Sequence, residues 1–207
     1  MLELAPDTEQ TRGLLERIAG GDKEALNQLL ARYRKGLHEF VAVRLGADLQ
    51  ARLDPSDVVQ EAQLEAARRI DDFLRRRPMP FHVWIRKTAY KRLLNAQRDH
   101  RLAARRAVAR EARRLERSSL LLARPLLQSA HSPSEQLMAR ELAERVAAAV
   151  GKLSEADRDI LLMRHAENLP YEEISCLLDI ELAAARKRYG RALIRLQRVL
   201  SEQGLLE

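Results

Sequence analysis

Apolar residues recur at intervals of three and four along most of this chain, and this repeat is typical of helices that bury one face. The two clearest series are Leu26, Leu30, Tyr33, Leu37 and Phe40, and Val58, Ala62, Ala66, Ile70 and Phe73. Aromatic residues make up only 4% of the sequence, while helix-favouring Ala, Leu, Arg and Glu are abundant. We therefore expect an all-α fold with almost no strand, and 207 residues suffice for two small helical domains.

Capping residues and prolines mark the helix ends of the N-terminal half. Asp22 is placed to cap one helix, and Asp54 to cap the next, which has Pro55 at its first position. Two prolines interrupt the stretch "LRRRPMP", residues 74–80, so we expect a loop there. A new helix should begin at residue 81, with Trp84, Thr88 and Leu94 facing inward.

The C-terminal part contains a second group of helices. One should begin near residue 134, with Leu137, Leu142, Val146 and Val150 facing inward. Ser154 and Asp157 have the spacing of a capping box for the next helix. The pattern that follows predicts two helices, over residues 171–178 and 181–200, separated by a break at Asp179.

Positive charge is unevenly distributed along the chain. There are 37 Lys and Arg against 30 Asp and Glu overall, but 12 against 3 between residues 86 and 117. Such a charge balance favours a polyanionic partner. The next segment holds a single charge, two prolines and several serines, as is typical of a linker. We expect a helical domain over 1–117, a linker over 118–133 and a second helical domain over 134–207.

The last two helices have the pattern of a helix-turn-helix, in which one helix braces another that enters the major groove. The second helix should face the core with Leu182, Ala185, Tyr189, Ala192, Leu196 and Leu200. Its expected DNA contacts are Arg186, Lys187, Arg188, Gly190 and Arg191. An amphipathic helix with solvated charges would give the same pattern, so both interpretations stay open at this point.

Several other kinds of chemistry have no sequence signature. Cys176 is the only cysteine, which excludes an internal disulfide, and we expect it in the core. The five histidines lack metal-ligand spacing, and we find no phosphate-binding glycine loop or nucleophile motif. We therefore expect no metal, no cofactor and no enzymatic activity. No apolar run approaches the roughly 20 residues that span a bilayer, and the N-terminus does not resemble a signal peptide, so we expect a cytoplasmic protein.

Two segments together resemble the extracytoplasmic-function (ECF) sigma factors of bacterial RNA polymerase, in the sigma-70 superfamily. The first comprises "DPSDVVQEAQLEAARRIDDF" and "FHVWIRKTAYKRLLNAQRDHR", and the second is "LSEADRDILLMRHAENLPYEEISCLLDIELAAARKRYGRALIRLQRVL". The resemblance implies a sigma factor that directs promoter-specific transcription initiation. Core RNA polymerase and promoter DNA would be its partners, with an anti-sigma factor as a further candidate. The first domain would dock on the polymerase and open the minus-ten element, and the second would read the minus-thirty-five element.

The resemblance also implies roles for particular residues. Those implied to dock on the polymerase are Asp57, Gln60 and Glu61. Those implied to hold the melted strand are Trp84, Lys87, Lys91, Arg92, Asn95 and Arg98. Trp84 fits a core position equally well, since it has helical spacing from Thr88. The chain departs from the family pattern at Pro170, Asp179 and Glu181; Asp tolerates the left-handed turn conformation, but base preference cannot be carried over.

Two other functions stay open on the sequence. A stand-alone helix-turn-helix regulator would bind duplex DNA by itself, as a dimer over paired half-sites. A nonspecific binder of nucleic acid or of an anionic surface would use the basic stretch 86–117 and lose affinity steeply with salt.

Overall fold

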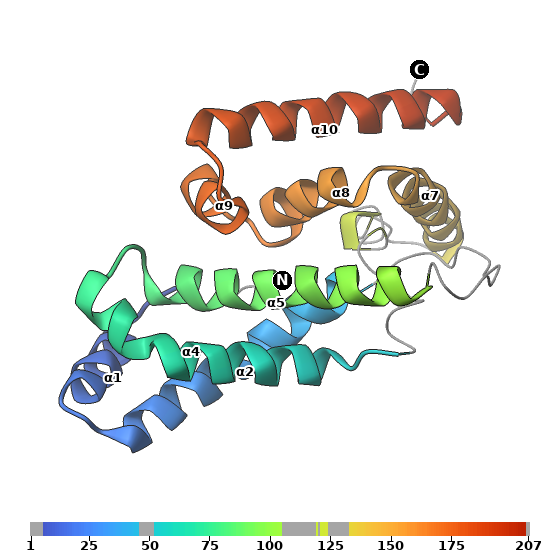
Figure 1. The fold of residues 1–207 in the computed structure, drawn as a ribbon. Helices are drawn as coiled ribbons and strands as arrows, with labels where there is room; N and C mark the ends of the chain where they lie inside the picture. The colour runs from blue at the N-terminus through green and yellow to red at the C-terminus, as the bar shows by residue number, and fades with distance from the viewer. Residues whose placement is uncertain (1–5, 46–51, 105–118, 120, 124–132, 206–207) are drawn as a thin grey trace. The chain divides into compact units, whose positions relative to one another are not determined.

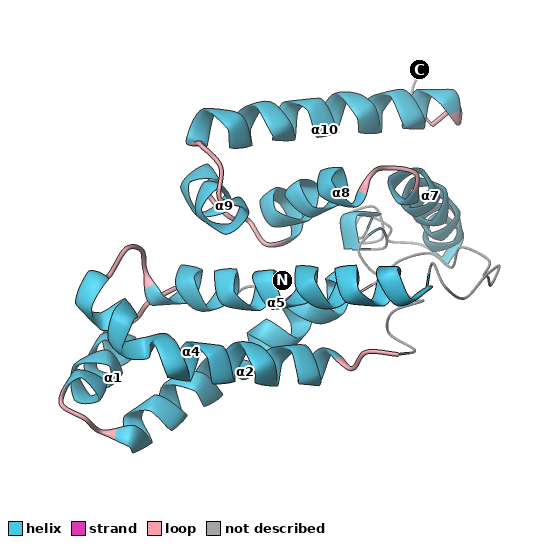
Figure 2. Ribbon diagram, viewed as in Figure 1, coloured by secondary structure: helices cyan, strands magenta, loops and turns pink. Residues whose placement is uncertain are grey.

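The computed structural model describes residues 6–45, 52–104, 119, 121–123 and 133–205 (Figure 1). Every regular element in these ranges is helical, which confirms the all-α expectation (Figure 2). The chain divides into two compact units. We call them the N-terminal unit, with the helices within residues 2–110, and the C-terminal unit, with the helices within residues 111–207.

The predicted boundaries near residues 117 and 133 fall where little is described. Residues 105–118 and most of the proposed linker lie outside the described residues, as does the outer half of the basic stretch. The predicted domain limits therefore stay a prediction.

The described part of the N-terminal unit contains four helices: α1 (Glu9–Ala19), α2 (Lys23–Arg44), α4 (Pro55–Arg76) and α5 (Phe81–Ala104). Helices α2, α4 and α5 pack against one another, and α1 packs on α2 and α4. The predicted stripe of α4 is confirmed, because all five of its residues are buried.

The helix starts of this unit follow the capping prediction. The side chain of Asp22 accepts hydrogen bonds from the backbone N–H groups of Glu24 and Ala25. Asp54 does the same for Ser56, and Pro55 occupies the first position of α4. Both helices therefore begin where a side-chain oxygen satisfies N–H groups that have no partner within the helix.

Two expectations for this unit need correction. The buried stripe of α2 begins with Ala25 and Leu29, while Leu26 and Leu30 are only half-buried. On α5 the buried residue is Leu93, and Leu94 is exposed. In both helices leucines stand next to each other or next to alanine, so spacing alone does not decide which one faces the neighbouring helices.

The C-terminal unit contains five described elements: α7 (Pro133–Gly151), α8 (Glu155–Leu161), the π-helical turn η1 (Leu162–Ala166), α9 (Tyr171–Leu178) and α10 (Leu182–Glu202). Helix α10 packs against α7, α8 and α9. The core of the C-terminal unit is formed by the fully buried residues Ile160, Leu161, Leu162, Met163 and Ile174, together with Ala185 and Ala192 of α10.

Further corrections concern α7 and Cys176. Leu137 and Leu142 are exposed, and α7 instead buries Ala143 and Ala147, although Val150 is buried as expected. Small side chains on this face let α7 pack closely, so the larger leucines lie outside it. Cys176 is half-buried and not part of the closed core.

Within the described ranges, each helix is too short or too polar to cross a lipid bilayer.

The register of α2 yields a stability test. Leu29 is 0% exposed, so Leu29→Ala should lower the free energy of unfolding by about 2–5 kcal/mol through lost burial and a residual cavity. The matched variant Leu26→Ala, three positions earlier on the same helix, should cost about 1 kcal/mol or less because part of that side chain is already in water. Urea unfolding followed by the fluorescence of the single Trp measures both. Equal losses, or a larger loss at Leu26, would contradict this register.

Candidate nucleic-acid interfaces

The corner between α4 and α5 is a short loop. Helix α4 continues to Arg76, so the expected loop 74–80 is shorter than its sequence suggested. The prolines forbid helix only from the residue before Pro78, and Arg77 there takes the left-handed conformation, with φ 38° and ψ 56°. The chain therefore turns within four residues.

Aromatic rings fill the inside of this corner. Phe73 of α4 lies 4.7 Å from Trp84 and 5.6 Å from Phe81 of α5, measured between ring centroids. Phe81 also packs edge-on against Tyr33 of α2, at 5.3 Å. Rings at these separations and angles attract one another beyond their buried area. The cluster fixes three helices at the point where the loop begins.

A hollow of about 350 Å³ lies beside this corner, between α4 and α5. Five of the six residues implied to hold the melted strand line it, namely Trp84, Lys87, Lys91, Arg92 and Asn95. The remaining lining residues, Glu65, Arg69, Pro78, Met79 and Thr88, were not predicted as site residues. Glu65 and Arg69 come from α4 and become neighbours of α5 only through the fold, so no local sequence pattern predicts them as part of this site.

The individual side chains of this hollow have different surroundings. Trp84 is mostly buried in the aromatic cluster, so it is a core residue whose remaining surface reaches the hollow. Arg92 donates to Glu65 across the two helices at 2.9 Å. Arg98 lies outside the lining and is exposed, with its guanidinium 3.4 Å from the Asn95 side-chain oxygen. The hollow thus combines an aromatic edge, cations and amide groups.

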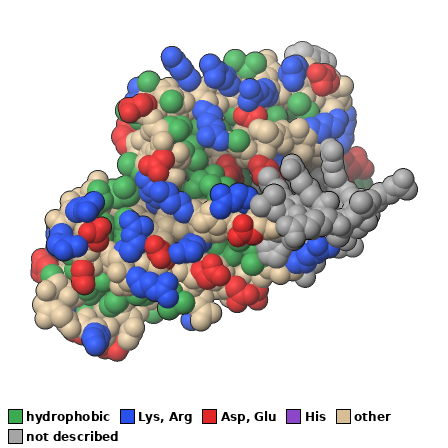
Figure 3. Space-filling view, in the orientation of Figure 1, with side chains coloured by type: hydrophobic (Ala, Val, Ile, Leu, Met, Phe, Trp, Pro, Cys, Tyr) green, Lys and Arg blue, Asp and Glu red, His purple; other side chains and the backbone are tan. Residues whose placement is uncertain are grey.

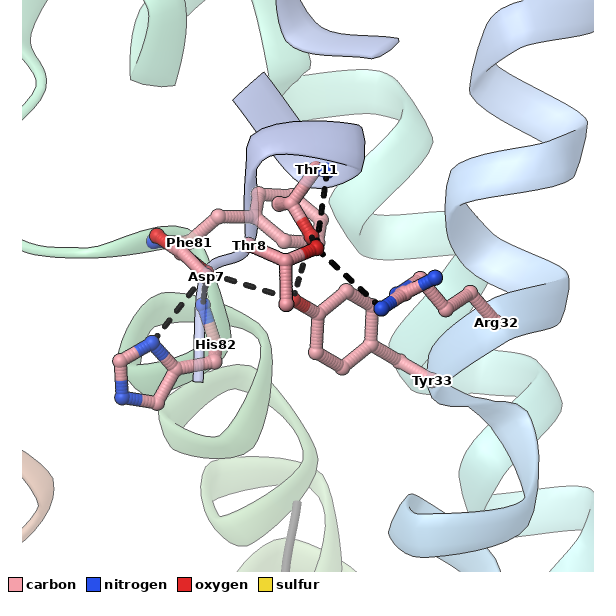
Figure 4. Close-up of polar contacts among 7 residues, drawn as sticks. All are labelled: Asp7, Thr8, Thr11, Arg32, Tyr33, Phe81 and His82. Atoms are coloured by element: carbon pink, nitrogen blue, oxygen red, sulfur yellow. Dashed lines mark hydrogen bonds and ion pairs between the residues drawn. The ribbon is translucent and has the colours of Figure 1, made fainter. Parts of the chain in front are cut away.

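The start of α5 is held by a residue from the other end of the unit. Asp7 accepts hydrogen bonds from the backbone N–H groups of Phe81, at 2.6 Å, and His82, at 2.9 Å (Figure 4). The hydroxyl of Tyr33 also donates to Asp7, at 3.2 Å, and the His82 ring nitrogen Nδ1 lies 3.2 Å from it. The sequence did not single out Asp7.

These contacts change how the groups titrate. Burial raises the pKa of Asp7, but hydrogen bonds from His82 and Phe81 outweigh it and leave this pKa below the ordinary value of 3.8. The charged carboxylate therefore stabilises the fold at pH values above the ordinary pKa of 3.8, and this stabilisation is lost as the pH falls through the lowered pKa. Burial raises the pKa of Tyr33 to about 12, so its hydroxyl keeps its proton at neutral pH.

The solvent-facing side of α4 carries the residues implied to dock on the polymerase. Asp57, Gln60 and Glu61 are all exposed, and no side-chain partner is recorded for them among the described residues. Their spacing places them on one face of the helix. Leu64, 52% exposed, continues the same face and adds an apolar side chain that sequence reasoning did not select.

The helix-turn-helix of the C-terminal unit has the predicted limits. Asp179 ends α9 in the left-handed conformation, with φ 55° and ψ 44°, and its N–H donates to the carbonyl of Ser175. This confirms the expectation that Asp179 takes the left-handed turn conformation. Pro170 and Glu181 precede the two helices without a side-chain cap. Glu172 and Glu173 lie in the first turn of α9, where their negative charges interact favourably with the positive end of the helix dipole.

The exposed face of α10 carries its cations. Lys and Arg side chains line α10 in the space-filling view (Figure 3). Arg186, Lys187 and Arg191 are exposed, while Ala185 and Ala192 are buried, as predicted. Gly190 is half-buried, and a Cβ atom added there would meet no atom within 4 Å. Packing within the chain therefore does not require glycine at this position.

Two arginines of α10 contact α8. Arg188 donates to the backbone carbonyl of Ala156 at 3.4 Å, which distinguishes it from the other residues expected to contact DNA. Arg195 donates to both carboxylate oxygens of Asp157, at 2.7 and 2.9 Å. Asp157 also receives a hydrogen bond from the hydroxyl of Ser154, so the predicted capping box is confirmed and joined to α10.

Aromatic and basic side chains cluster at the entrance to α9. Tyr171 packs edge-on against Tyr189 at 5.7 Å, and the guanidinium of Arg186 lies 5.7 Å from the Tyr171 ring centre. Arg186 also lies 3.9 Å from Glu172. The Tyr189 hydroxyl and His165 Nε2 are 2.8 Å apart; burial and the nearby Arg164 lower the pKa of His165, while burial raises that of Tyr189. Arg186 thus contacts α9, whereas the exposed Lys187 and Arg191 take no part in these contacts.

Metal binding has no support in the part of the chain that the structure describes, where no three His, Cys, Asp or Glu side chains gather as ligands.

The structure thus has a helix-turn-helix in one unit and a hollow lined with basic residues in the other. The family described as Sigma-70, region 4, matches residues 143–196, which run from α7 into α10. The ECF RNA polymerase sigma-E factor of Escherichia coli (strain K12) is 29% identical over 180 residues, covering 86% of this chain and 88% of that protein. The RNA polymerase sigma-H factor of Pseudomonas aeruginosa is 28% identical over 184 residues, covering 89% and 90%.

Solved structures show the same fold. CnrH, in complex with the cytosolic domain of CnrY, matches with a TM-score of 0.58 at 22% identity, over 94% of this chain and 99% of that one. The sigma factor RpoE of Bartonella quintana, in complex with the anti-sigma factor NepR, matches with a TM-score of 0.56 at 16% identity, over 84% and 96%. These likenesses support the role of an RNA polymerase sigma factor, and over most of its length the chain is similar to sigma factors of the ECF type.

The pair formed by Arg195 and Asp157 gives a prediction for the C-terminal unit. The Asp157 side chain is only 6% exposed, so Arg195→Met should leave a buried carboxylate short of a donor and cost about 1–3 kcal/mol of stability. Arg198→Met is the matched control, since Arg198 and its partner Glu202 are both exposed, and it should change stability by about 0.5 kcal/mol or less. Hydrogen exchange along α10 measures both variants. Equal protection in the two would contradict the role of this pair.

Proposed function

We propose that this sigma factor uses three surfaces to direct core RNA polymerase to its promoters. The outer face of α4 docks on the polymerase, the hollow between α4 and α5 holds a base of the melted minus-ten strand, and α10 reads the minus-thirty-five element. The observation that carries this proposal is that one hollow in the N-terminal unit is lined by five of the six residues that the resemblance implied for strand binding. A helix-turn-helix by itself would not require that site.

Docking through α4 is supported by its exposure and composition. Two acids, an amide and the exposed Leu64 share one face, with no partners recorded within the described chain. Exposed apolar side chains bordered by charges are typical of protein contacts. Asp57, Gln60 and Glu61 do not line the hollow, so docking and strand binding would use different residues of the same unit.

Strand binding in the hollow is supported by its chemistry. Single strands are held by cations along the phosphates and by aromatic or polar surfaces beside an unstacked base. Lys87 and Lys91 are placed for the phosphates, while Trp84, Thr88 and Asn95 border the hollow. The pair of Arg92 with Glu65 keeps the two walls together at 2.9 Å. Its volume, about 350 Å³, lies within the range of ligand pockets, about 300–1,000 Å³.

Duplex binding by α10 is supported by the exposed Arg186, Lys187 and Arg191 in its N-terminal half. Arg pairs with guanine through two hydrogen bonds, while Lys suits a phosphate. Gly190 adds an open stretch of backbone where DNA could approach closely. Arg188 donates to the Ala156 carbonyl, so its guanidinium also links α10 to α8.

The relatives suggest the remaining partners and the setting. Relatives named as RNA polymerase sigma factors, and a sigma factor solved in complex with an anti-sigma factor, favour core polymerase and an anti-sigma protein as partners of this chain. Such a protein acts in the cytoplasm and performs no catalysis of its own. The predicted domains, 1–117 and 134–207, would then correspond to sigma regions two and four. A stand-alone regulator is not favoured, because the relatives match along both units.

Charge reversal on α4 tests the docking surface. Glu61→Lys should weaken the binding of core RNA polymerase by roughly tenfold or more. Reversing a charge that is paired across an interface should cost at least about 1.4 kcal/mol of binding free energy, which corresponds to a tenfold change in affinity. Glu16→Lys, on the exposed side of α1, makes the same charge change and should leave the affinity within about twofold. Fluorescence titration of labelled chain with core polymerase measures both. Equal affinities for the two variants would remove α4 as the docking face.

Base reading by α10 is tested on holoenzyme and a selected promoter. Arg191→Ala should weaken promoter binding by roughly 5- to 150-fold and relax preference at one base pair, if its guanidinium pairs with guanine. Arg198→Ala, near the C-terminal end of the same helix, should have a small effect at most. A shift of similar size for both, uniform across sequences, would mean that α10 contributes charge without reading bases.

A further inference from the structure

Helix α5 begins without a cap of its own. Its preceding residue is Pro80, whose carbonyl accepts from the N–H of Trp84 at 3.0 Å but whose side chain has no oxygen to offer. The first N–H groups of any helix have no partner inside the helix and need one from elsewhere. At this position the need is met across 74 residues, by the carboxylate of Asp7.

The carboxylate uses both oxygens for this purpose. Oδ2 accepts from the N–H of Phe81, while Oδ1 accepts from the N–H of His82 (Figure 4). Its negative charge lies at the positive end of the α5 dipole. Asp7 is therefore a helix cap supplied by a distant segment, and it ties the N-terminal segment of the chain to α5.

The Asp7 segment is itself fixed on α2. The Tyr33 hydroxyl donates to Asp7 and lies 3.2 Å from the Thr11 hydroxyl. Arg32 donates to the Thr8 hydroxyl at 3.2 Å and also to the side chain of Gln10. Contacts with Tyr33 and Arg32 of α2 therefore hold in place the segment that carries Asp7.

The capped turn adjoins the hollow. Trp84 follows His82 by two residues and lines the hollow, and Pro78 and Met79 of the preceding loop line it too. Phe81, whose N–H is capped, also packs on Trp84 at 5.7 Å. A change in the capped turn therefore acts directly on the aromatic edge and the loop that border the hollow.

We propose that Asp7 is a positioning residue for strand capture: by holding the first turn of α5 it sets Trp84 and the loop 77–80 in the arrangement that receives the unstacked base. This inference rests on the proposed function of the hollow. Loss of Asp7 impairs promoter opening, while docking on α4 and duplex reading by α10 are retained.

The test uses full-length Asp7→Ala in holoenzyme with core polymerase on a selected promoter. Opening is followed by the fluorescence of 2-aminopurine placed in the minus-ten element, and total promoter binding is measured in parallel. The rate or extent of opening should fall by roughly fivefold or more, as loss of a helix cap implies, at nearly unchanged affinity for core polymerase. Asp7→Asn, which keeps one acceptor oxygen, should lie between Asp7→Ala and the unchanged chain.

Asp22→Ala is the matched control. It removes a cap of the same chemistry from α2 in the same unit, but α2 contributes no residue to the hollow. Opening by Asp22→Ala should stay within about twofold of the unchanged chain, because its cap loss is of the same order but remote. Equal opening by Asp7→Ala and Asp22→Ala would overturn the inference. If Asp7→Ala does not fold, Tyr33→Phe, which keeps the ring and removes one donor to Asp7, should show the same loss of opening in smaller measure, and normal opening by it would equally overturn the inference.

A third arm separates this inference from the function on which it rests. The double variant Lys91→Ala with Asn95→Ala alters the hollow and leaves Asp7 intact. Normal opening by this variant would remove the hollow as the strand site, and the inference with it. A defect here together with normal opening by Asp7→Ala would leave the hollow in place and overturn only the role of Asp7. The inference is supported if opening is impaired both in Asp7→Ala and in the double variant, and if hydrogen exchange at the start of α5 is faster in Asp7→Ala.

Discussion

The N-terminal unit depends on the corner where α4 meets α5. The chain must leave α4 before Pro78 and re-enter a helix after Pro80, and the rings of Phe73, Phe81 and Trp84 determine the angle between the two helices. Because the same corner borders the hollow, packing and proposed strand binding cannot vary independently. A single residue, Trp84, belongs to both. The fold shows that Trp84 is a core residue with one edge on the hollow, and strand contact through that edge stays a prediction.

The C-terminal unit solves a similar problem with charge in place of aromatic rings. Helix α10 exposes most of its cations, yet it must be held firmly on α8 and α9 to present them at a defined angle. Buried alanines allow close approach, and Arg195 with Asp157 joins α10 to the cap of α8. Arg188 adds a contact to the same helix. Some basic residues of α10 thus position the helix, and others remain for the partner.

The fold was largely predictable from the sequence. Helical periodicity, the caps at Asp22, Asp54 and Ser154 and the turn at Asp179 are local properties, and each is observed. Errors arose where two apolar residues compete for one face, as with Leu29 and Leu26, because tertiary neighbours decide which is buried. For the site, the α5 residues were found through resemblance, but Glu65 and Asp7 were missed. Their contacts span 27 and 74 residues, and no local pattern encodes such a separation.

The most direct test of this account maps transcription starts on a promoter library, using purified core RNA polymerase with and without this chain. A sigma factor of the proposed kind should create discrete new starts that share two motifs at a fixed spacing, one in the melted region and one upstream. If no start depends on the chain and the chain fails to co-elute with core polymerase, the three-surface account is contradicted.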